Sequence, residues 1–164
     1  TRSAKSAKDL LSDATKRIVT ILRGSNAATA RYLASCIRPM GIGRGAAYLV
    51  LIRSSAERET LHAPGISYKG KIFTFYFLPE KKVFLDRKLK EAFDLIDREK
   101  MVYPSDAARA LDVNRATAWC LLSHLSYVGL INQIDFVKGN PFSMPGHATT
   151  LRNLIETKYN AEGC

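Results

Sequence analysis

The sequence predicts a mainly helical protein made of two similar domains, each with a small antiparallel β-sheet. Apolar residues recur at the spacing of amphipathic helices along most of the 164-residue chain. One segment alternates as a half-buried strand does, with Phe73, Phe75 and Phe77 separated by Thr74 and Tyr76. A helical segment of the first half is echoed in the second half at an offset of 71 residues, which indicates an internal duplication.

The first half is expected to form three helices followed by a hairpin. A short basic arm at residues 1–8 precedes the first helix, which carries apolar residues from Leu10 to Leu22 and ends at Gly24. Proline and glycine in "RPMG" predict the turn between the second and third helices. The later elements are expected in this order: a helix at 26–37, a turn at 38–41, a helix at 42–58, a strand at 60–63, a loop at 64–71 and a strand at 72–78.

The second half is expected to repeat this order after a linker at 79–82, so that the domains span residues 9–80 and 81–164. Ser105 is a candidate N-cap for its second helix, and Gly129 is expected to end its third helix. The expected elements are helices at 87–100, 104–111 and 115–128, a turn at 112–114 and a strand at 130–137. A last helix is expected after them, with an apolar stripe at Leu151, Leu154, Ile155 and Tyr159.

The duplication is clearest in the third helices of the two halves. The offset is 71 residues there and 74 residues earlier in the repeat, because the first copy has a longer turn. The matched pairs are Ile42 with Val113, Arg44 with Arg115, Ala47 with Ala118, Tyr48 with Trp119, and Leu51 with Leu122.

The segment "SDAARALDVNRATAWCLLSHLSYVGLI" resembles the core of the winged helix-turn-helix superfamily. It has a polar cap, a small-residue helix, a short turn, a second helix, and Gly-Leu-Ile leading into a strand. The first half resembles this pattern more weakly, so the chain looks like a tandem winged-helix protein. The resemblance implies that each third helix is a recognition helix for the major groove, and that the hairpin is a wing that contacts the DNA backbone. The same fold also serves as a protein–protein module.

Positive charge is concentrated in the first half of the chain. The net charge is +10, and residues 1–82 hold 15 Lys and Arg against five acidic residues, whereas residues 83–164 hold ten against ten. No acidic residue lies between Ala14 and Ala56. A surface of one sign attracts polyanions, and nucleic acid is the commonest polyanion in a cell. A solubility charge without a ligand is the alternative.

The outward faces of the third helices are unusual for base recognition, which mostly uses Arg, Lys, Asn and Gln. The expected outward residues are Gly45, Leu49 and Ile52 in the first copy. In the second copy they are Ala116, Cys120 and Ser123, on the side of the helix opposite a buried stripe of Ala118, Leu122 and Leu125. DNA contacts are therefore expected mostly with phosphates, at helix starts, helix flanks and the hairpin tip. The expected DNA-binding residues are Arg31, Arg38, Arg44, Tyr48, Arg53, Lys69, Lys71, Asn114, Arg115 and Thr117.

Three interpretations of these helices remain open. Duplex DNA is held through its phosphates, unpaired bases of single-stranded DNA stack on Tyr48 and Trp119, or the outward apolar residues form an interface. The charge distribution favours DNA binding by the first domain and association, with a second copy or another protein, by the second. Trp119 is expected to be largely shielded in such an interface. The expected interface residues are Trp119, Cys120, Leu151, Leu154, Ile155 and Tyr159.

No sequence pattern indicates catalysis, a cofactor or a metal site. Cys36, Cys120 and Cys164 are an odd number without metal-ligand spacing, and the three histidines stand apart in the sequence. "MGIGRGAA" neither follows a strand nor precedes a lysine, so it lacks the context of a phosphate-binding loop. No apolar run is long enough for a membrane span, and we expect a soluble protein of the cytoplasm, at the nucleoid, or of the nucleus.

The expected function is non-enzymatic DNA binding in transcription regulation, replication initiation or chromosome organisation. The alternative is an adaptor that holds other proteins together in a replication, transcription or condensin-like complex. In the first case the partner is double-stranded or single-stranded DNA. In the second it is a protein, including a second copy of this chain.

Overall fold

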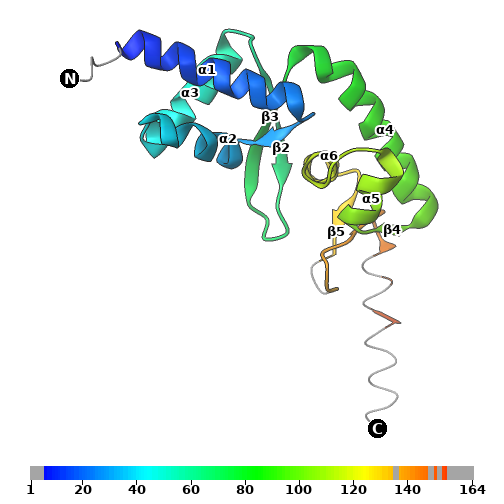
Figure 1. Ribbon diagram of the computed structural model, residues 1–164. Helices are drawn as coiled ribbons and strands as arrows, with labels where there is room; N and C mark the ends of the chain where they lie inside the picture. The colour runs from blue at the N-terminus through cyan, green and yellow to red at the C-terminus, as the bar shows by residue number, and fades with distance from the viewer. Residues whose placement is uncertain (1–5, 135–136, 148–149, 151–152, 155–164) are drawn as a thin grey trace. The chain divides into compact units, whose positions relative to one another are not determined.

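The computed structural model describes residues 6–134, 137–147, 150, 153 and 154 (Figure 1). This part of the chain is mainly helical and has two small antiparallel sheets, which confirms the predicted fold class at that level. The chain divides into two compact units. The N-terminal unit consists of Thr1–Pro64 with Phe73–Asp86, and the C-terminal unit of Gly65–Ile72 with Arg87–Cys164.

The two halves of the chain pass through the same order of elements: helix, strand, helix, helix, strand, strand. The first half contains α1 (Ala7–Gly24), β1 (Ala28–Thr29), α2 (Ala30–Ile37), α3 (Arg44–Ala56), β2 (Leu61–Ile66) and β3 (Ile72–Phe77). The second half contains α4 (Lys82–Glu99), β4 (Met101–Val102), α5 (Pro104–Leu111), α6 (Arg115–Tyr127), β5 (Asn132–Gln133) and β6 (Phe142–Ser143). The strand orders, β1-β3-β2 and β4-β6-β5, are also equivalent.

Equivalent helices have equal lengths, which supports the internal duplication. α1 and α4 have 18 residues each, α2 and α5 have 8, and α3 and α6 have 13. α6 begins 71 residues after α3 and α5 begins 74 residues after α2, so both predicted offsets are confirmed. The two offsets differ because the turn between the second and third helices is longer in the first copy. It holds the 3₁₀ helix η1 (Arg38–Met40) and Gly41 in the first copy, but is closed by the left-handed Asp112 in the second.

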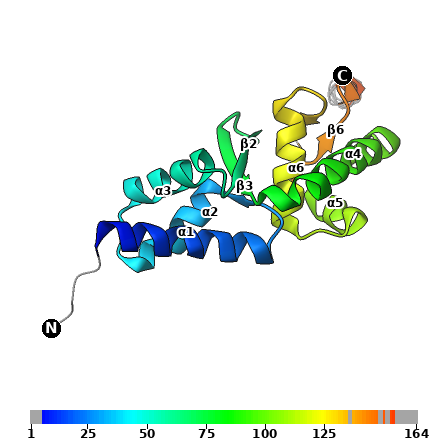
Figure 2. The same ribbon diagram turned by 90° about the horizontal axis from the view of Figure 1, so that it is seen from above.

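The hydrophobic core of the N-terminal unit lies among α1, α2 and α3, which Figure 2 shows packed together. Ile18 and Leu22 from α1, Leu33 and Ile37 from α2, and Leu51 from α3 are fully buried. Each such side chain contributes roughly 1.5–3 kcal/mol by leaving water. The core therefore fixes the relative positions of three helices that together carry seven lysines and arginines.

The C-terminal unit has an equivalent core. Ile96 from α4, Leu122 from α6, Ile131 before β5, and Phe142 from β6 are fully buried, and Leu111 from α5 is nearly so. Val102 of β4 pairs with Phe142, so the small sheet closes one side of this core. The core holds the first turns of α5 and α6 beside the loop that joins β5 to β6.

The last three residues of strand β3 are buried on both faces of the strand, although the sequence pattern predicted a strand with one exposed face. Tyr76 packs into the N-terminal core, while Phe75 and Phe77 alternate with it and lie with their ring centroids 6.3 Å apart. All three residues are buried. The strand was therefore predicted correctly, but its burial was not, because burial increases along the strand and does not alternate.

Several helix starts differ from the predicted ones, and α2 begins at Ala30 instead of residue 26 because Ala28–Thr29 form β1. α1 begins at Ala7, within the expected basic arm, because the Ser6 hydroxyl caps it by accepting from the Asp9 N–H at 3.1 Å. The expected linker is helical, since η2 (Pro79–Lys81) leads directly into α4. The division between the two units falls within α4.

The predicted N-cap of α5 is wrong, and the sequence did not indicate β4 or β6. Tyr103 occupies the N-cap position and Pro104 the first turn, where the missing proline N–H leaves no helical hydrogen bond unmade. β2 also extends through Pro64 and Gly65, which were expected in a loop. Of the strand expected at 130–137, only Asn132–Gln133 is a strand within the described residues.

The predicted last helix lies largely outside the described residues. Leu151, Ile155 and Tyr159 are among those not described, and Leu154 is exposed. Among the helices that are described, none combines the length and the apolar character needed to cross a lipid bilayer.

Candidate nucleic-acid interface

Exposed arginines lie on successive elements of the N-terminal unit. Arg31 is on α2, Arg38 begins η1, and Arg44 begins α3, and all three side chains are exposed. None of them forms an ion pair with an acidic residue in the described part of the chain. The segment between Ala14 and Ala56 contains no acid, so none of these arginines has an acidic neighbour close in the sequence. The guanidinium groups thus keep their full charge for a ligand.

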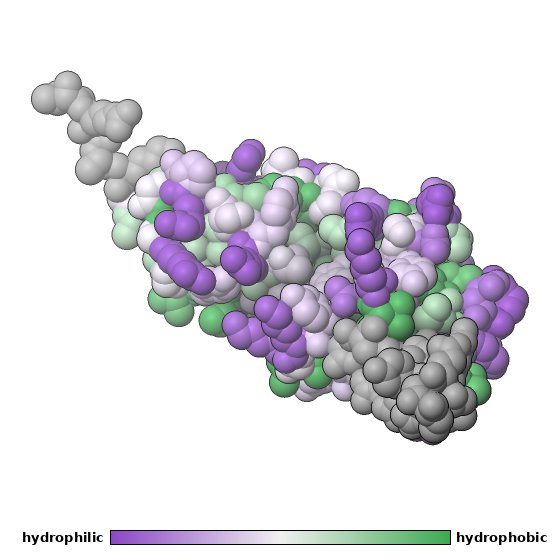
Figure 3. Space-filling model, turned by 90° about the horizontal axis from the view of Figure 1, so that it is seen from below, coloured by the Kyte–Doolittle hydropathy of each residue, from purple (hydrophilic) through white to green (hydrophobic). Residues whose placement is uncertain are grey.

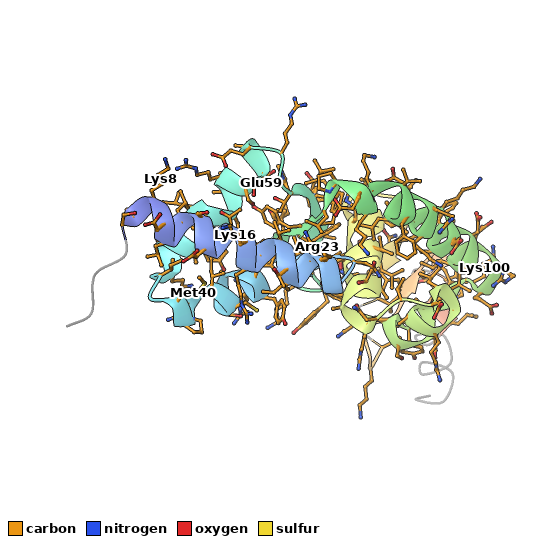
Figure 4. All side chains as sticks on the ribbon, turned by 45° about the horizontal axis from the view of Figure 1, so that its top comes forward. Lys8, Lys16, Arg23, Met40, Glu59 and Lys100 are labelled. Carbon is orange, nitrogen blue, oxygen red and sulfur yellow. The ribbon has the colours of Figure 1, made fainter. Side chains whose placement is uncertain are left out.

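Further cations lie along α1. Lys16, Arg17 and Arg23 are exposed, and Figure 4 shows Lys16 and Arg23 along this helix. Figure 3 shows that strongly hydrophilic side chains on one face of the molecule are scattered among apolar and neutral ones, not gathered in one block.

The outward face of α3 is apolar, as predicted. Gly45 is exposed, and Leu49 and Ile52 keep 67% and 58% of their surface in contact with water. The predicted buried residues Ala47 and Leu51 are fully buried on the opposite side. The centre of this face therefore has no side-chain hydrogen-bond donor for a base edge.

The two predicted contacts beside that face differ in availability. Arg53 is exposed, but its Nε lies 3.0 Å from the Glu57 carboxylate, so its charge is partly balanced. Tyr48 is half-buried and packs against the N-terminal core. Part of the Tyr48 side chain is therefore covered by its own unit.

The turn between β2 and β3 carries the predicted lysines. Lys69 and Lys71 are both exposed, and the Lys69 ammonium lies 5.5 Å from the centroid of the Tyr68 ring. Ser67 closes the turn, because its N–H donates to the Lys71 carbonyl and its carbonyl accepts from the Gly70 N–H, both at 2.8 Å. This turn belongs to the C-terminal unit, where the Gln133 side-chain amide donates to the Ile66 carbonyl at 2.6 Å.

The start of α6 presents one cation and one capping residue. The Asn114 side chain accepts from the Thr117 N–H at 2.7 Å and thereby caps the helix. Arg115 is exposed and has no acidic partner among the residues that the structure covers. Thr117 is fully buried, so the prediction that its side chain contacts DNA is wrong.

The outward face predicted for α6 is also wrong at two of its three positions. Ala116 is exposed, but Cys120 and Ser123 are fully buried, as are the correctly predicted Ala118 and Leu122. More than one side of α6 is covered, so burial is not confined to a single stripe. Burial raises the pKa of the Cys120 thiol to about 12, and the thiol is not accessible to a second copy of the chain.

Trp119 is half-buried in the C-terminal unit. Its ring meets that of Phe142 edge-on, with centroids 5.7 Å apart and an interplanar angle of 68°, and it packs against the unit's core. It also lines a pocket of about 390 Å³ at the start of α6. The loop residues of this pocket, Gly139 and Asn140, were missed in the sequence, where the only signal was a Gly-Asn pair between two possible strands.

One histidine is not isolated in space, although the sequence suggested so. The Ser55 hydroxyl lies 2.5 Å from His62 Nδ1, and the His62 ring lies 5.9 Å from that of Tyr76. No group of three His, Cys, Asp or Glu side chains suited to a metal ion occurs in the described ranges.

A comparison of the sequence with known protein families and with curated proteins finds no match. A proposal for the function therefore depends on the geometry of the residues described above.

Proposed function

We propose that this chain is a non-enzymatic, tandem winged-helix protein that binds double-stranded DNA. In this proposal, α2 with α3 and α5 with α6 are the two helix-turn-helix pairs, and the β2–β3 and β5–β6 hairpins are the wings. The repeated order of helix, strand, helix, helix, strand, strand supports it, as does the equivalent strand order of the two sheets. The function would be transcription regulation, replication initiation or chromosome organisation.

The observation that carries DNA binding is the set of exposed arginines on α2, η1 and α3 that have no acidic partner among the described residues. Arg31, Arg38 and Arg44 lie on three consecutive elements of one compact unit. Arginine matches phosphate with two parallel hydrogen bonds, and each phosphate that it neutralises releases counterions. A chain held in this way binds DNA mainly through its backbone.

Base recognition would then be weak. Leu49 and Ile52 at the centre of α3 offer no hydrogen-bond donor, although apolar side chains can contact the thymine methyl group. Gly45 is small, which allows close approach of the helix to a sugar–phosphate backbone. We therefore expect similar affinity for duplexes of different sequence.

The proposal is tested by fluorescence anisotropy with a short labelled duplex. Replacing Arg31, Arg38 and Arg44 together by glutamine is expected to weaken binding by about a hundredfold or more at low salt, because three phosphate contacts are lost. The control replaces Arg87, Arg98 and Arg109, which are exposed arginines of the second half, and removes the same net charge. Equal loss in both variants would contradict a specific basic face on the N-terminal unit.

A second candidate function is that of a protein adaptor, and a specific apolar surface favours it. A pocket of about 310 Å³ opens beside the exposed Leu49. It is lined by Ala7, Leu10, Leu11, Ile42, Ala46, Leu49, Val50 and Arg53. Apolar surface of this kind commonly marks a protein contact.

The adaptor function predicts association that depends on this surface. Leu49→Glu is expected to abolish self-association measured by sedimentation velocity. Its affinity for duplex DNA is expected to fall less than the affinity of the triple arginine variant does. A wild-type chain that stays monomeric at all concentrations would remove self-association from consideration.

A further inference from the structure

The pocket at the start of α6 has the size and composition of a ligand site. Its volume of about 390 Å³ lies within the range of roughly 300–1,000 Å³ typical of small-molecule sites. Three segments of the C-terminal unit form it: the first residue of α5, the first two turns of α6, and the loop between β5 and β6. Its lining residues are Pro104, Arg115, Ala116, Trp119, Gly139 and Asn140.

The wall of the pocket is an aromatic ring in a fixed orientation. Trp119 lines the pocket while Phe142 holds the indole edge-on, at a centroid distance of 5.7 Å. Phe142 is itself fully buried in the core. A preorganised aromatic ring is a stacking platform for a flat heterocycle, and every nucleobase has such a face. Tyr48, its counterpart in the first half, is packed against the core of the N-terminal unit.

A tight loop also lines the pocket, through Gly139 and Asn140. Gly139 has φ +93°, and a Cβ at this position would come within 2.9 Å of Tyr103 Cε1, so the loop backbone lies directly against the Tyr103 ring. Asn140 follows with φ +51°. The loop thus presents an amide side chain, which can both donate and accept hydrogen bonds, at a defined place in the pocket.

The pocket also includes a cation. Arg115 is exposed and unpaired within the described chain, and it lies one helical turn before Trp119, so both side chains share one face of α6. A guanidinium group is suited to phosphate because it can donate two parallel hydrogen bonds. The pocket therefore combines groups for a flat ring, for a polar ring edge and for an attached phosphate.

We propose that this pocket binds an unpaired nucleobase with its phosphate, the base against Trp119 and the phosphate on Arg115. In a duplex, both faces of each base are covered by neighbouring bases, so only a base outside the stack can reach the indole. Single strands, strand ends and bulges supply such bases. The inference rests on the proposed nucleic-acid binding and adds the form of nucleic acid that the C-terminal unit recognises.

Trp119 itself is the reporter of the test, because the chain contains one tryptophan. The full chain is titrated with hexathymidylate, with an abasic strand of the same length, and with thymidine 5′-phosphate. Hexathymidylate is expected to quench the Trp119 emission and to protect it from iodide. The abasic strand has the same phosphates but no base, and is expected to do neither. Equal effects of the two strands would overturn the proposal.

Two matched arginine variants distinguish binding in the pocket from a general effect of positive charge. Arg115→Gln is expected to weaken hexathymidylate binding roughly tenfold, the scale of one charge-assisted contact. Arg109→Gln, at an exposed position of α5, also removes one charge but breaks an ion pair with Asp106, and is expected to change the affinity less than about twofold. Equal losses in the two variants would also overturn the proposal.

A tryptophan variant tests the stacking without removing the ring. Trp119→Phe retains an aromatic contact with Phe142, and a thermal unfolding curve checks that the fold is kept. Its affinity for labelled hexathymidylate is expected to fall several-fold to tenfold because the smaller ring stacks less well. Unchanged affinity in a folded variant would contradict the assignment of Trp119.

The same titrations distinguish this inference from the proposed function. Tight, salt-sensitive duplex binding without base-dependent quenching would refute the pocket and leave the duplex function standing. Base-dependent quenching without duplex binding would do the reverse. If thymidine 5′-phosphate binds as tightly as the strand, the pocket is supported and its natural ligand is a free nucleotide.

Discussion

The sharpest quantitative test of the proposed DNA binding is its dependence on salt and on Arg44. Five predicted cations on the N-terminal helices and the β2–β3 turn are exposed and have no acidic partner among the described residues: Arg31, Arg38, Arg44, Lys69 and Lys71. If each neutralises one phosphate, the logarithm of affinity falls with that of salt concentration at a slope of about −4.5. Between about 50 and 200 mM salt, the affinity should then fall about 500-fold.

Removing one contact changes that slope by a calculable amount. Arg44→Gln should reduce it to about −3.6, so that the same salt interval weakens binding only about 150-fold. The matched control is Arg98→Gln, which removes the same charge from an arginine that lies 3.3 Å from the Glu99 carboxylate in the last turn of α4. Its slope should remain about −4.5, because Arg98 is not among the five proposed contacts.

The assay is fluorescence anisotropy of a labelled duplex at four or more salt concentrations, with all three proteins compared at each one. A slope near zero for the wild-type chain would remove electrostatic binding of duplex DNA. Equal slopes for wild type and Arg44→Gln would remove Arg44 from the interface. A reduced slope for Arg98→Gln would show that net charge, and not the position of the arginine, governs the binding.

Three further predictions concern stability. The pKa of the buried Cys120 thiol is about 12, above the ordinary 9.0, so the free energy of unfolding should fall by about 1.4 kcal/mol per pH unit between pH 9 and pH 12. Urea unfolding at several pH values measures this fall, and Cys120→Ser should flatten it. Gly139→Ala should lower the melting temperature more than Gly146→Ala, because both glycines have φ near +90° but only Gly139 lies against Tyr103. Ser123→Ile should cost about 1–3 kcal/mol by overpacking a fully buried site, whereas Ile52→Ser on an exposed site should cost less than about 0.5 kcal/mol. Equal costs for these last two variants in chemical unfolding would contradict the burial assigned to α6.

The sequence predicted the long helices well because their signals are local. The boundaries of α3 and α6 lie within two residues of the predicted ones, and Gly129 follows α6 closely as expected. The apolar spacing and the turn residues that determine these boundaries all lie within the helix or next to it. The internal offset was also predictable, since it is read directly from matched residues of the two copies.

The short strands could not be predicted because two residues carry no periodicity. β4 exists because Met101 and Val102 pair with Ser143 and Phe142, about 40 residues later in the chain. The segment after the strand expected at 130–137 therefore contains a strand, β6, that only its partners define. The pocket beside Trp119 depends on the same pairing, so no local pattern pointed to it.

The buried face of α6 had a signal that the single-stripe interpretation did not use. Residues 118–122 are small or apolar on all sides, and a helix without a polar face is commonly buried. α3 has a similarly continuous apolar segment, yet Leu49 and Ile52 are exposed. The helix sequence alone therefore did not decide exposure, which depends on what packs against each copy.

The equivalent positions of α3 and α6 show how the two copies have diverged. Leu49 corresponds to Cys120 and Ile52 to Ser123, and in both pairs the large apolar residue is exposed while the small one is fully buried. Small side chains at the buried positions allow close packing on α6, since larger ones would have to displace their neighbours. Large apolar side chains left in water on α3 add little to folding stability, and they would gain burial only where a ligand covers them. The repeat therefore retains one scaffold but offers different surfaces: the whole outward face of α3 in the first copy, and only the first turns of α6, with Arg115 and Trp119, in the second.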